Sequence, residues 1–291
     1  MGKCDTYCMR FPGGKAKALT FSYDDGIEQD IRLIEILKAN GMKGTFNICS
    51  GRFAPEDTVY PPGTFWRPMK ESQCVELYKE NGMEVALHGL LHSSMTYIPK
   101  NVCVYEVSQD RINLERAFDD IVRGLAYPCG RYDDDVIDIL RQCGIAYART
   151  IKNTEGFELP EEWLAWHPTC HHDNPRLMEL AKTFIEAENM GRPYLFYVWG
   201  HSYDYDRADN WHVIEEFVEY MGNREDVWYA TNMEIYDYVT AYRQLVFSMN
   251  GNKIYNPTHT TLFFEVIPQL FNVKTGHYCV KPGETITLQE E

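Results

Sequence analysis

The hydrophobic and polar positions of this 291-residue chain alternate between two kinds of segment over most of its length. Short apolar runs such as Ala16–Tyr23 are typical of buried strands, whereas Ile31–Asn40 has apolar residues at helical spacing and is followed by Gly41. The same succession continues to Val246. We expect strands at 16–23, 43–48, 83–88, 124–128, 145–150, 194–200 and 227–231, and helices at 31–40, 74–82, 104–122, 133–144, 177–191, 211–222 and 234–246.

Continuous apolar strands that alternate with helices indicate parallel strands buried on both faces, in a barrel or an open sheet, so the expected fold class is α/β. The end of the chain has a different pattern, in which residues 261–267, 277–281 and 284–289 are short strand-like pieces with no helix between them. We therefore expect one α/β domain over residues 1–246 and a small β appendage over residues 247–291.

Composition and charge narrow the classes of function. The formal charge of −15, from 28 basic and 43 acidic residues, disfavours nucleic acids and anionic membranes as partners. No apolar segment is long enough to span a bilayer, and the first residues lack the apolar core of a secretory signal, so a cytoplasmic location is expected. Nine irregularly spaced cysteines indicate reduced thiols rather than a disulfide framework or a cysteine-rich zinc site. The acidic composition permits a monomer as readily as a dimer.

Two adjacent carboxylates, Asp24 and Asp25, follow the first expected strand. Functional residues of α/β sheets and barrels gather where strands end. Two like charges at such a point repel each other, which makes a metal ion held by one of them a candidate. Asp-Asp-Gly is also an ordinary turn sequence, so the pair alone does not decide between a turn and a site.

Three histidines also lie at or just after expected strands. His88 and His92 follow the strand 83–88 and would share one helical face if this segment were helical. With a carboxylate they would form a two-histidine, one-carboxylate set that leaves a coordination position open for water. His201 follows the strand 194–200 and is a candidate proton donor, because histidine titrates near neutral pH. Each histidine could instead have a packing or hydrogen-bonding role.

Four segments, FSYDDG, EVALHGLLHSS, LAYPCGRYDDDVIDIL and VWGHSYDYD, occur in this order and each includes or follows an expected strand. They resemble the successive motifs of the polysaccharide deacetylase family, the nodulation-type chitooligosaccharide deacetylases of carbohydrate esterase family four. The similarity covers about residues 17–246. It implies a distorted parallel (β/α) barrel, a divalent metal that is usually zinc, and hydrolysis of an N-acetyl group on an amino sugar.

The resemblance also implies roles for individual residues. Asp24 matches the general base and His201 the general acid, while Asp25, His88 and His92 match the metal ligands. The third motif departs from the family, because Ala126 stands where many members have an arginine that accompanies the base. Arg149 or Arg131 could supply that positive charge instead.

Further residues are expected to lie near the substrate. A backbone N–H of the turn that contains Tyr127 and Cys129 would stabilise the oxyanion, and Cys129 would be either a reactive thiol or a small buried filler. Trp166 and Trp199 are candidates for a platform on which a sugar ring stacks, although buried packing explains most tryptophans equally well. His171 and His172 could form a metal site, but adjacent residues of an extended segment point apart, which favours substrate-lining or structural roles.

Three functions remain open at this stage. The first is a metal-dependent amide hydrolase that removes acetate from an N-acetylated sugar or oligosaccharide. The second is hydrolysis of a small cyclic amide or ureide on the same barrel. The third is an inactive relative that only binds carbohydrate.

Overall fold

The computed structural model describes residues 7–188, 191–267 and 273–289. A curved parallel sheet of eight strands forms the centre of these described ranges, with β9 beside β2 and the other strands in the order β6-β5-β4-β3-β2-β8-β7. The predicted α/β fold with a barrel-like parallel sheet is confirmed in the form of a curled half-barrel. Its strands are β2 (Lys17–Asp24), β3 (Thr45–Ile48), β4 (Glu84–Leu87), β5 (Gly124–Ala126), β6 (Tyr147–Arg149), β7 (Cys170–His171), β8 (Tyr194–Gly200) and β9 (Val227–Tyr229).

The segment that leads into β7 spans the gap between the two edges of the sheet. Trp166 donates to Ala148 of β6 and accepts from Thr150, so it continues the sheet beyond β6. Three residues later, Thr169 donates to Tyr197 of β8. These two attachments curl the sheet around and bring the ends of β6 and β8 toward each other.

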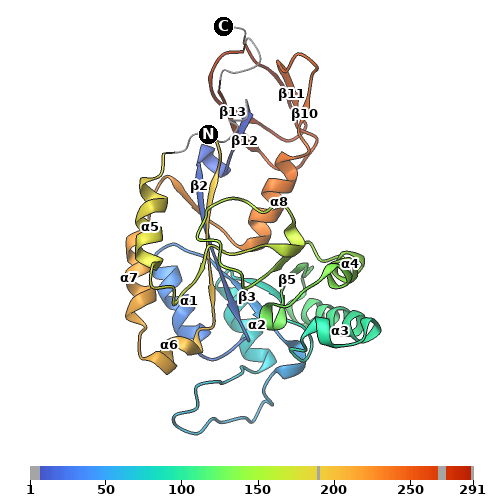
Figure 1. The fold of residues 1–291 in the computed structure, drawn as a ribbon, viewed down its shortest axis with the longest axis vertical. Coiled ribbons are helices and arrows are strands. Elements are labelled where there is room, and N and C mark those ends of the chain that lie inside the picture. The colour runs from blue at the N-terminus through green and yellow to red at the C-terminus, as the bar shows by residue number, and fades with distance from the viewer. Residues whose placement is uncertain (1–6, 189–190, 268–272, 290–291) are drawn as a thin grey trace.

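Helices flank the sheet (Figure 1). Most of them match the expected segments, although α5 is shorter than expected and residues 189–190 of that expected helix lie outside the described residues. Expectation missed α6, a short helix that directly follows His201 and Ser202. The helices are α1 (Asp30–Ala39), α2 (Glu71–Glu80), α3 (Lys100–Phe118), α4 (Asp134–Gln142), α5 (Leu177–Glu186), α6 (Tyr203–Ala208), α7 (His212–Met221) and α8 (Asn232–Tyr242), with short 3₁₀ turns at Pro12–Gly14, Ser50–Arg52, Met95–Tyr97, Pro128–Gly130 and Trp163–Ala165.

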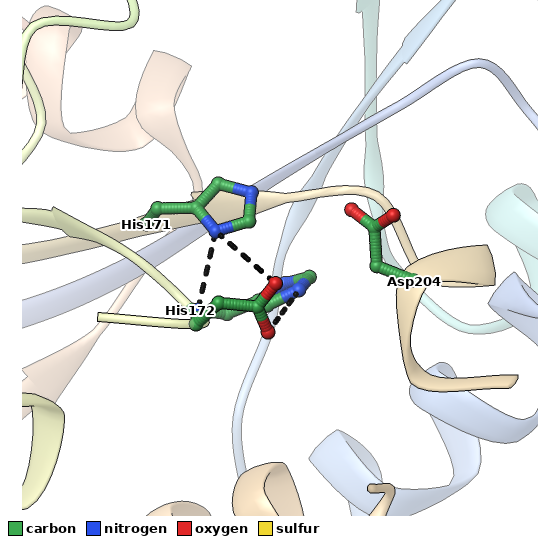
Figure 2. A group of neighbouring side chains, drawn as sticks. His171, His172 and Asp204 are labelled. Carbon is green, nitrogen blue, oxygen red and sulfur yellow. Dashed lines mark hydrogen bonds and ion pairs between the residues drawn. The ribbon is translucent and has the colours of Figure 1, made fainter. Parts of the chain in front are cut away.

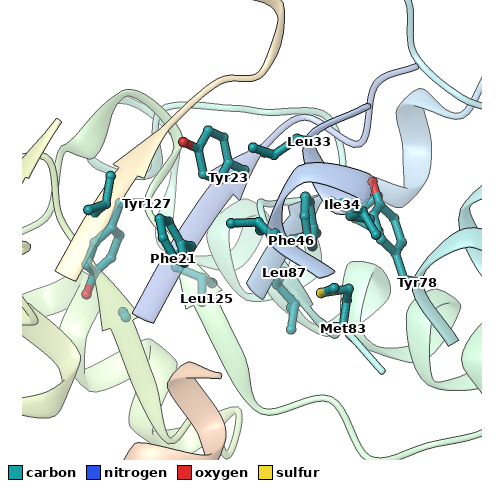
Figure 3. Packing of buried hydrophobic residues seen from close by; sticks show 14 of the residues in the cluster. Phe21, Tyr23, Leu33, Ile34, Phe46, Tyr78, Met83, Leu87, Leu125 and Tyr127 are labelled. Carbon is teal, nitrogen blue, oxygen red and sulfur yellow. The ribbon is translucent and has the colours of Figure 1, made fainter. Parts of the chain in front are cut away.

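The main hydrophobic core lies between the sheet and its helices. All eight residues of β2 are buried, as expected for a central parallel strand that is covered on both faces. Figure 3 shows Phe46 of β3 packed near Tyr78 of α2 and Ile34 of α1. A second core cluster joins the underside of the sheet to the C-terminal strands, for example through Tyr197 and Phe264.

Two small antiparallel sheets complete the described chain. One contains β1 (Tyr7–Arg10), β12 (Leu262–Val266) and β13 (Gly276–Val280), and the other contains β10 (Val246–Phe247), β11 (Lys253–Tyr255) and β14 (Thr285–Thr287). The C-terminal strands were expected, but β1 comes from the opposite end of the chain and pairs with β12. The boundary at residue 246 stays a prediction, and it assigns β1 and its pairing partner to different parts.

The parallel arrangement places the carboxyl ends of β2, β4, β6 and β8 at one edge of the sheet. Asp24 ends β2 and Arg149 ends β6, while His88 and His201 directly follow β4 and β8. Functional residues of such sheets lie at this edge. Among the helices of the described ranges, none has both the length and the apolar character needed to cross a membrane.

Candidate active site

Asp24 and Asp25 are adjacent in sequence but have different surroundings. Asp24 is buried at the end of β2 and accepts a 2.8 Å hydrogen bond from the Asn47 side chain. Asp25 has left-handed backbone geometry (φ +82°), which is uncommon for a residue with a side chain and marks a sharp change of chain direction. As a result, both carboxylates face the same imidazole: His88 Nε2 lies 3.8 Å from Asp24 Oδ2 and 4.0 Å from Asp25 Oδ1.

His88, His92 and Asp25 form a cluster of three potential metal ligands. His92 Nε2 lies 4.0 Å from Asp25 Oδ1, and one ligating atom from each residue falls within 4.8 Å of the others. The segment that carries the histidines is a turn and not the helix that would place them on one face. Positive φ angles at Gly89 and His92 fold this turn back and bring the two rings to a centroid distance of 4.7 Å.

The donor set fits a divalent ion such as zinc. His88 Nδ1 lies 2.8 Å from the Ala126 carbonyl, to which it donates, and this bond fixes the tautomer with a free lone pair on Nε2. Two imidazoles and one carboxylate are the ligands that zinc takes in hydrolytic sites, with the fourth position left for water. Ligands at about 2.1 Å from a tetrahedral ion are roughly 3.4 Å apart, so the 4.0 Å separations seen here need only small side-chain movements.

Arg149 is the cation beside Asp24. Its Nη2 lies 2.5 Å from both carboxylate oxygens, and within the described residues Asp24 is its only hydrogen-bond partner. The guanidinium is fully buried and lies over the Trp199 ring at 4.7 Å. Burial alone would raise the pKa of Asp24, but Arg149, with smaller contributions from two histidines, lowers it to about 2. The alternative cation, Arg131, instead donates to the hydroxyl of Tyr97.

His201 faces Asp24 from the end of β8. Its Nε2 lies 3.8 Å from Asp24 Oδ2, and its Nδ1 lies 3.3 Å from Oδ2 of Asp204, which belongs to α6. Burial tends to lower the pKa of His201, but the hydrogen bond to Asp204 and the charges of the two aspartates at the end of β2 raise it. The imidazolium form is therefore favoured near neutral pH, which a proton donor requires.

Buried polar residues that the sequence analysis did not single out hold this site in place. Asn47 donates to Asp24 and to Ser22 Oγ, and Asp110 of α3 accepts from the backbone N–H groups of Ser50 and His88. Asp30 accepts from Ser202, the residue after His201, and from Tyr78. A polar residue inside an apolar segment, such as Asn47 within TFNI, is the sequence signal that could have indicated this role.

Asp30 gives the first testable prediction. It is completely buried, and burial raises its pKa to about 7. Because the folded state holds a proton that the unfolded chain releases near pH 4, this group stabilises the fold most at low pH and loses its contribution as the pH rises to 7. Asp30→Asn should therefore reduce the pH dependence of stability. We expect the stability difference between wild type and Asp30→Asn, measured by urea unfolding, to change by on the order of 4 kcal/mol between pH 4 and pH 8.

The matched control for this prediction is Asp206→Asn. Asp206 is only partly buried and its pKa is lowered, mainly by hydrogen bonds from Trp211 and Gln29 that outweigh burial. Its replacement should leave the loss of stability between pH 4 and pH 8 in place. If Asp30→Asn and wild type instead change in parallel across this range, Asp30 is ionised in the folded protein and the prediction is wrong.

The structure corrects part of the expected substrate side. Trp166 is only 1% exposed and packs among Tyr147, Trp163 and Tyr197, so the prediction that it stacks on a sugar is wrong. Tyr127 is equally buried, because its hydroxyl donates to the Leu164 carbonyl and its backbone N–H to Arg149, so it cannot contact substrate.

The other two expected substrate residues lie closer to the site. Trp199 is 9% exposed, Arg149 lies over its ring, and its indole N–H donates to Asn153. It therefore holds Arg149 and has little surface left for a sugar. Cys129 is exposed, with a positive φ in the turn after β5, so the interpretation as a buried filler is wrong.

Comparison with known proteins identifies the domain to which this geometry belongs. Residues 11–148 match the family model described as polysaccharide deacetylase. The chain carries a polysaccharide deacetylase domain. The matched residues include Asp24, Asp25, His88 and His92, whereas Arg149 and His201 lie beyond them. Curated protein sequences gave no match.

Solved structures show the same fold. A putative polysaccharide deacetylase from Mycobacterium smegmatis aligns with a TM-score of 0.57 and 17% identity, over 81% of this chain and 94% of that chain. The Xyl-CE4 domain of a multidomain xylanase from the hindgut metagenome of Trinervitermes trinervoides gives 0.50 and 13%, over 78% and 92%. The deacetylase PplD from Streptococcus pyogenes, in complex with acetate, gives 0.44 and 22%, over 50% of this chain and 61% of that chain. The polysaccharide deacetylase domain and the half-barrel therefore agree with each other.

Proposed function

We propose that this polysaccharide deacetylase domain is a metal-dependent amide hydrolase that removes the acetyl group of an N-acetylated sugar or oligosaccharide and releases acetate. The observation that carries the proposal is the convergence of Asp25, His88 and His92 beside an Asp24 that is ion-paired to Arg149. These residues come from strands far apart in sequence, and packing alone does not require them to meet. The nodulation-type subtype suggested by the motifs stays a prediction.

Asp25, His88 and His92 would hold the ion. A divalent metal such as zinc, when bound there, supplies a water of lowered pKa and a positive charge for the carbonyl oxygen. Asp24 does not need to bind it, since Arg149 and Asn47 already occupy Asp24 Oδ1. The other oxygen, Oδ2, faces the space between His88 and His201. Asp24 is therefore placed to receive a proton at Oδ2 from the attacking water.

His201 would complete the reaction at the other side of this space. Asp204 accepts from Nδ1, so the proton of the imidazolium that can be transferred lies on Nε2, the nitrogen that faces Asp24 Oδ2 at 3.8 Å. Donation from Nε2 to the leaving nitrogen allows a neutral amine to depart instead of an amine anion. Asp24 and His201 thus serve opposite proton transfers from adjoining positions.

A backbone N–H in the turn after β5 is the proposed oxyanion donor. In this turn the N–H of Tyr127 donates to Arg149 and that of Gly130 donates to Tyr127, while Pro128 has none. The N–H of Cys129 is the one that these bonds leave over, and the exposed position of Cys129 makes it reachable. Loss of one oxyanion donor typically lowers the rate about 100-fold or more.

The decisive experiment is an acetate-release assay with N-acetylglucosamine oligomers, run on the chelated protein before and after zinc is added. Zinc-dependent acetate release supports the proposal. Turnover of dihydropyrimidine-type cyclic amides or ureides without acetate would replace it with the small-amide hydrolase. Retained oligosaccharide binding without turnover in the presence of zinc would indicate an inactive relative.

His201→Ala provides a test of the proton donor. We expect the variant to lose about 100- to 1,000-fold in the rate of N-deacetylation, because the amine is a poor leaving group without a proton. With an aryl acetate, whose phenolate leaves without protonation, the loss should be less than about tenfold. The kcat values of both substrates are the measurement. An equal loss on both substrates would show that His201 acts on binding or on the attack step and not on the leaving group.

A further inference from the structure

A second group of ligand-type side chains lies beside the first, at the ends of β7 and β8. It consists of His171, His172, Asp173 and Asp204, and one ligating atom from each falls within 4.8 Å of the others. Figure 2 shows the two histidines on one strand end and Asp204 facing them from the start of α6. Of these residues only Asp204 contacts the proposed hydrolytic machinery, through His201.

The two adjacent histidines meet because the strand stops between them. β7 ends at His171, and His172 and Asp173 belong to the following turn, so the alternation of an extended strand no longer applies. The ring centroids lie 4.3 Å apart. The expectation that these side chains point apart is therefore wrong.

His172 is the residue that points most directly to a ligand. Its side chain is completely buried between the rings of Tyr23 and Tyr205, and neither ring nitrogen has a hydrogen-bond partner within the described residues. Burial of a polar group without a partner is costly and uncommon. Its Nε2 lies 3.2 Å from Asp173 Oδ1, so this nitrogen faces the group. Gly200 makes room for the ring, since a Cβ there would lie 2.0 Å from Nδ1.

The other three members have the protonation states that a cation requires. His171 Nδ1 accepts from the Asp173 N–H and lies 3.8 Å from Asp173 Oδ2, so its lone pair faces inward. Burial, followed by the neighbouring imidazole, lowers the pKa of His171 to about 4 and keeps the ring neutral. Asp204 binds His201 through Oδ2 and Arg207 through Oδ1, and each carboxylate oxygen has a second lone pair available.

We propose that His171, His172, Asp173 and Asp204 form a second divalent-cation site, separate from the Asp25 cluster and suited to zinc. Two imidazoles and two carboxylates are borderline ligands in the number that a closed tetrahedral zinc site uses. An ion there would join the turn after β7 to the start of α6 and would satisfy the buried His172 imidazole. The proposal does not depend on the hydrolytic activity.

Zinc stoichiometry of the full chain tests the proposal. After equilibrium dialysis against micromolar zinc and elemental analysis, we expect two equivalents in the wild type, one in Asp25→Ala, one in His171→Gln, and none in the double variant. His259→Gln, which changes an exposed histidine elsewhere, is the matched control and should bind two. One equivalent in the wild type and none in Asp25→Ala would overturn the proposal. So would a double variant that retains zinc, because the ion would then lie elsewhere.

A spectroscopic experiment isolates the second site in the Asp25→Ala background. Cobalt(II) bound by these residues should give the strong visible absorption of a tetrahedral complex, and Asp173→Asn should weaken cobalt affinity at least about tenfold. Asp173 has an exposed side chain, so this substitution leaves the core intact even if a change at His172 does not. Cobalt affinity and spectrum that are unchanged in Asp173→Asn and His171→Gln would contradict the proposed site.

Discussion

The Asp25→Ala variant should bind one equivalent of zinc fewer than the wild type and should lose about 1,000-fold or more of the deacetylation rate. Asp25 is the only carboxylate of the ligand cluster, and it lies at 4.0 Å from both His88 and His92. A metal contributes several kcal/mol to the stabilisation of charge in such reactions, and each 1.36 kcal/mol corresponds to about a tenfold change in rate. Zinc content and acetate release of the purified variant are the measurements.

The matched variant is Asp24→Asn, one position earlier. It should keep the zinc content of the wild type but lose activity by about 100- to 10,000-fold, because an amide cannot accept the proton that the carboxylate takes. The pair separates ligand from base at adjacent residues. Equal zinc content in wild type and Asp25→Ala would remove the ligand assignment, and an active Asp24→Asn would remove the base.

Arg149→Met should produce the second large effect. Without the guanidinium, Asp24 is a buried carboxylate that has lost its main counter-charge, so its pKa should rise from about 2. The acid limb of the profile of kcat/KM against pH should therefore move to higher pH. Removal of one partner of a buried ion pair typically costs about 3–5 kcal/mol, so the free energy of unfolding should also fall. The pH profile and urea unfolding of the variant measure the two effects.

Two controls make the Arg149 test specific. Arg131→Met removes the other arginine considered for this role, an exposed residue that binds Tyr97, and should change neither the acid limb nor stability. The double variant Arg149→Met/Asp24→Asn removes both charges and should recover much of the lost stability. If Arg149→Met leaves the acid limb where it is in the wild type, the group that titrates there is not Asp24.

The sequence predicted the parallel half-barrel well because its strands are continuous apolar runs separated by helices with clear periodicity. It could not show that Tyr7–Arg10 joins the C-terminal strands, since an antiparallel pairing between the two ends of the chain leaves no local pattern. It also missed α6, which is too short and too polar to have a helical period. Local rules therefore identified the elements but not the pairing of distant ones.

The predicted site residues divide in a similar way. Asp24, Asp25, His88 and His201 were recognisable because each lies at or just after the end of an apolar strand, and the parallel sheet brings those ends together. The choice of Arg149 over Arg131 depends on which residue of β6 faces Asp24, a matter of tertiary packing. Burial explains the failures: Trp166 has a sequence typical of a binding platform, but the segment that carries it closes the sheet and covers its ring.

The pairing of β1 with β12 has a consequence for biosynthesis. On a ribosome, Tyr7–Arg10 emerges first, whereas Leu262–Val266 emerges only after the whole half-barrel has been made. Contacts so distant in sequence form late, and an apolar strand edge that waits for its partner is a point at which nascent chains can associate wrongly. The catalytic half-barrel can assemble its central strands during translation, but the sheet that contains β1 must be completed after synthesis has nearly ended.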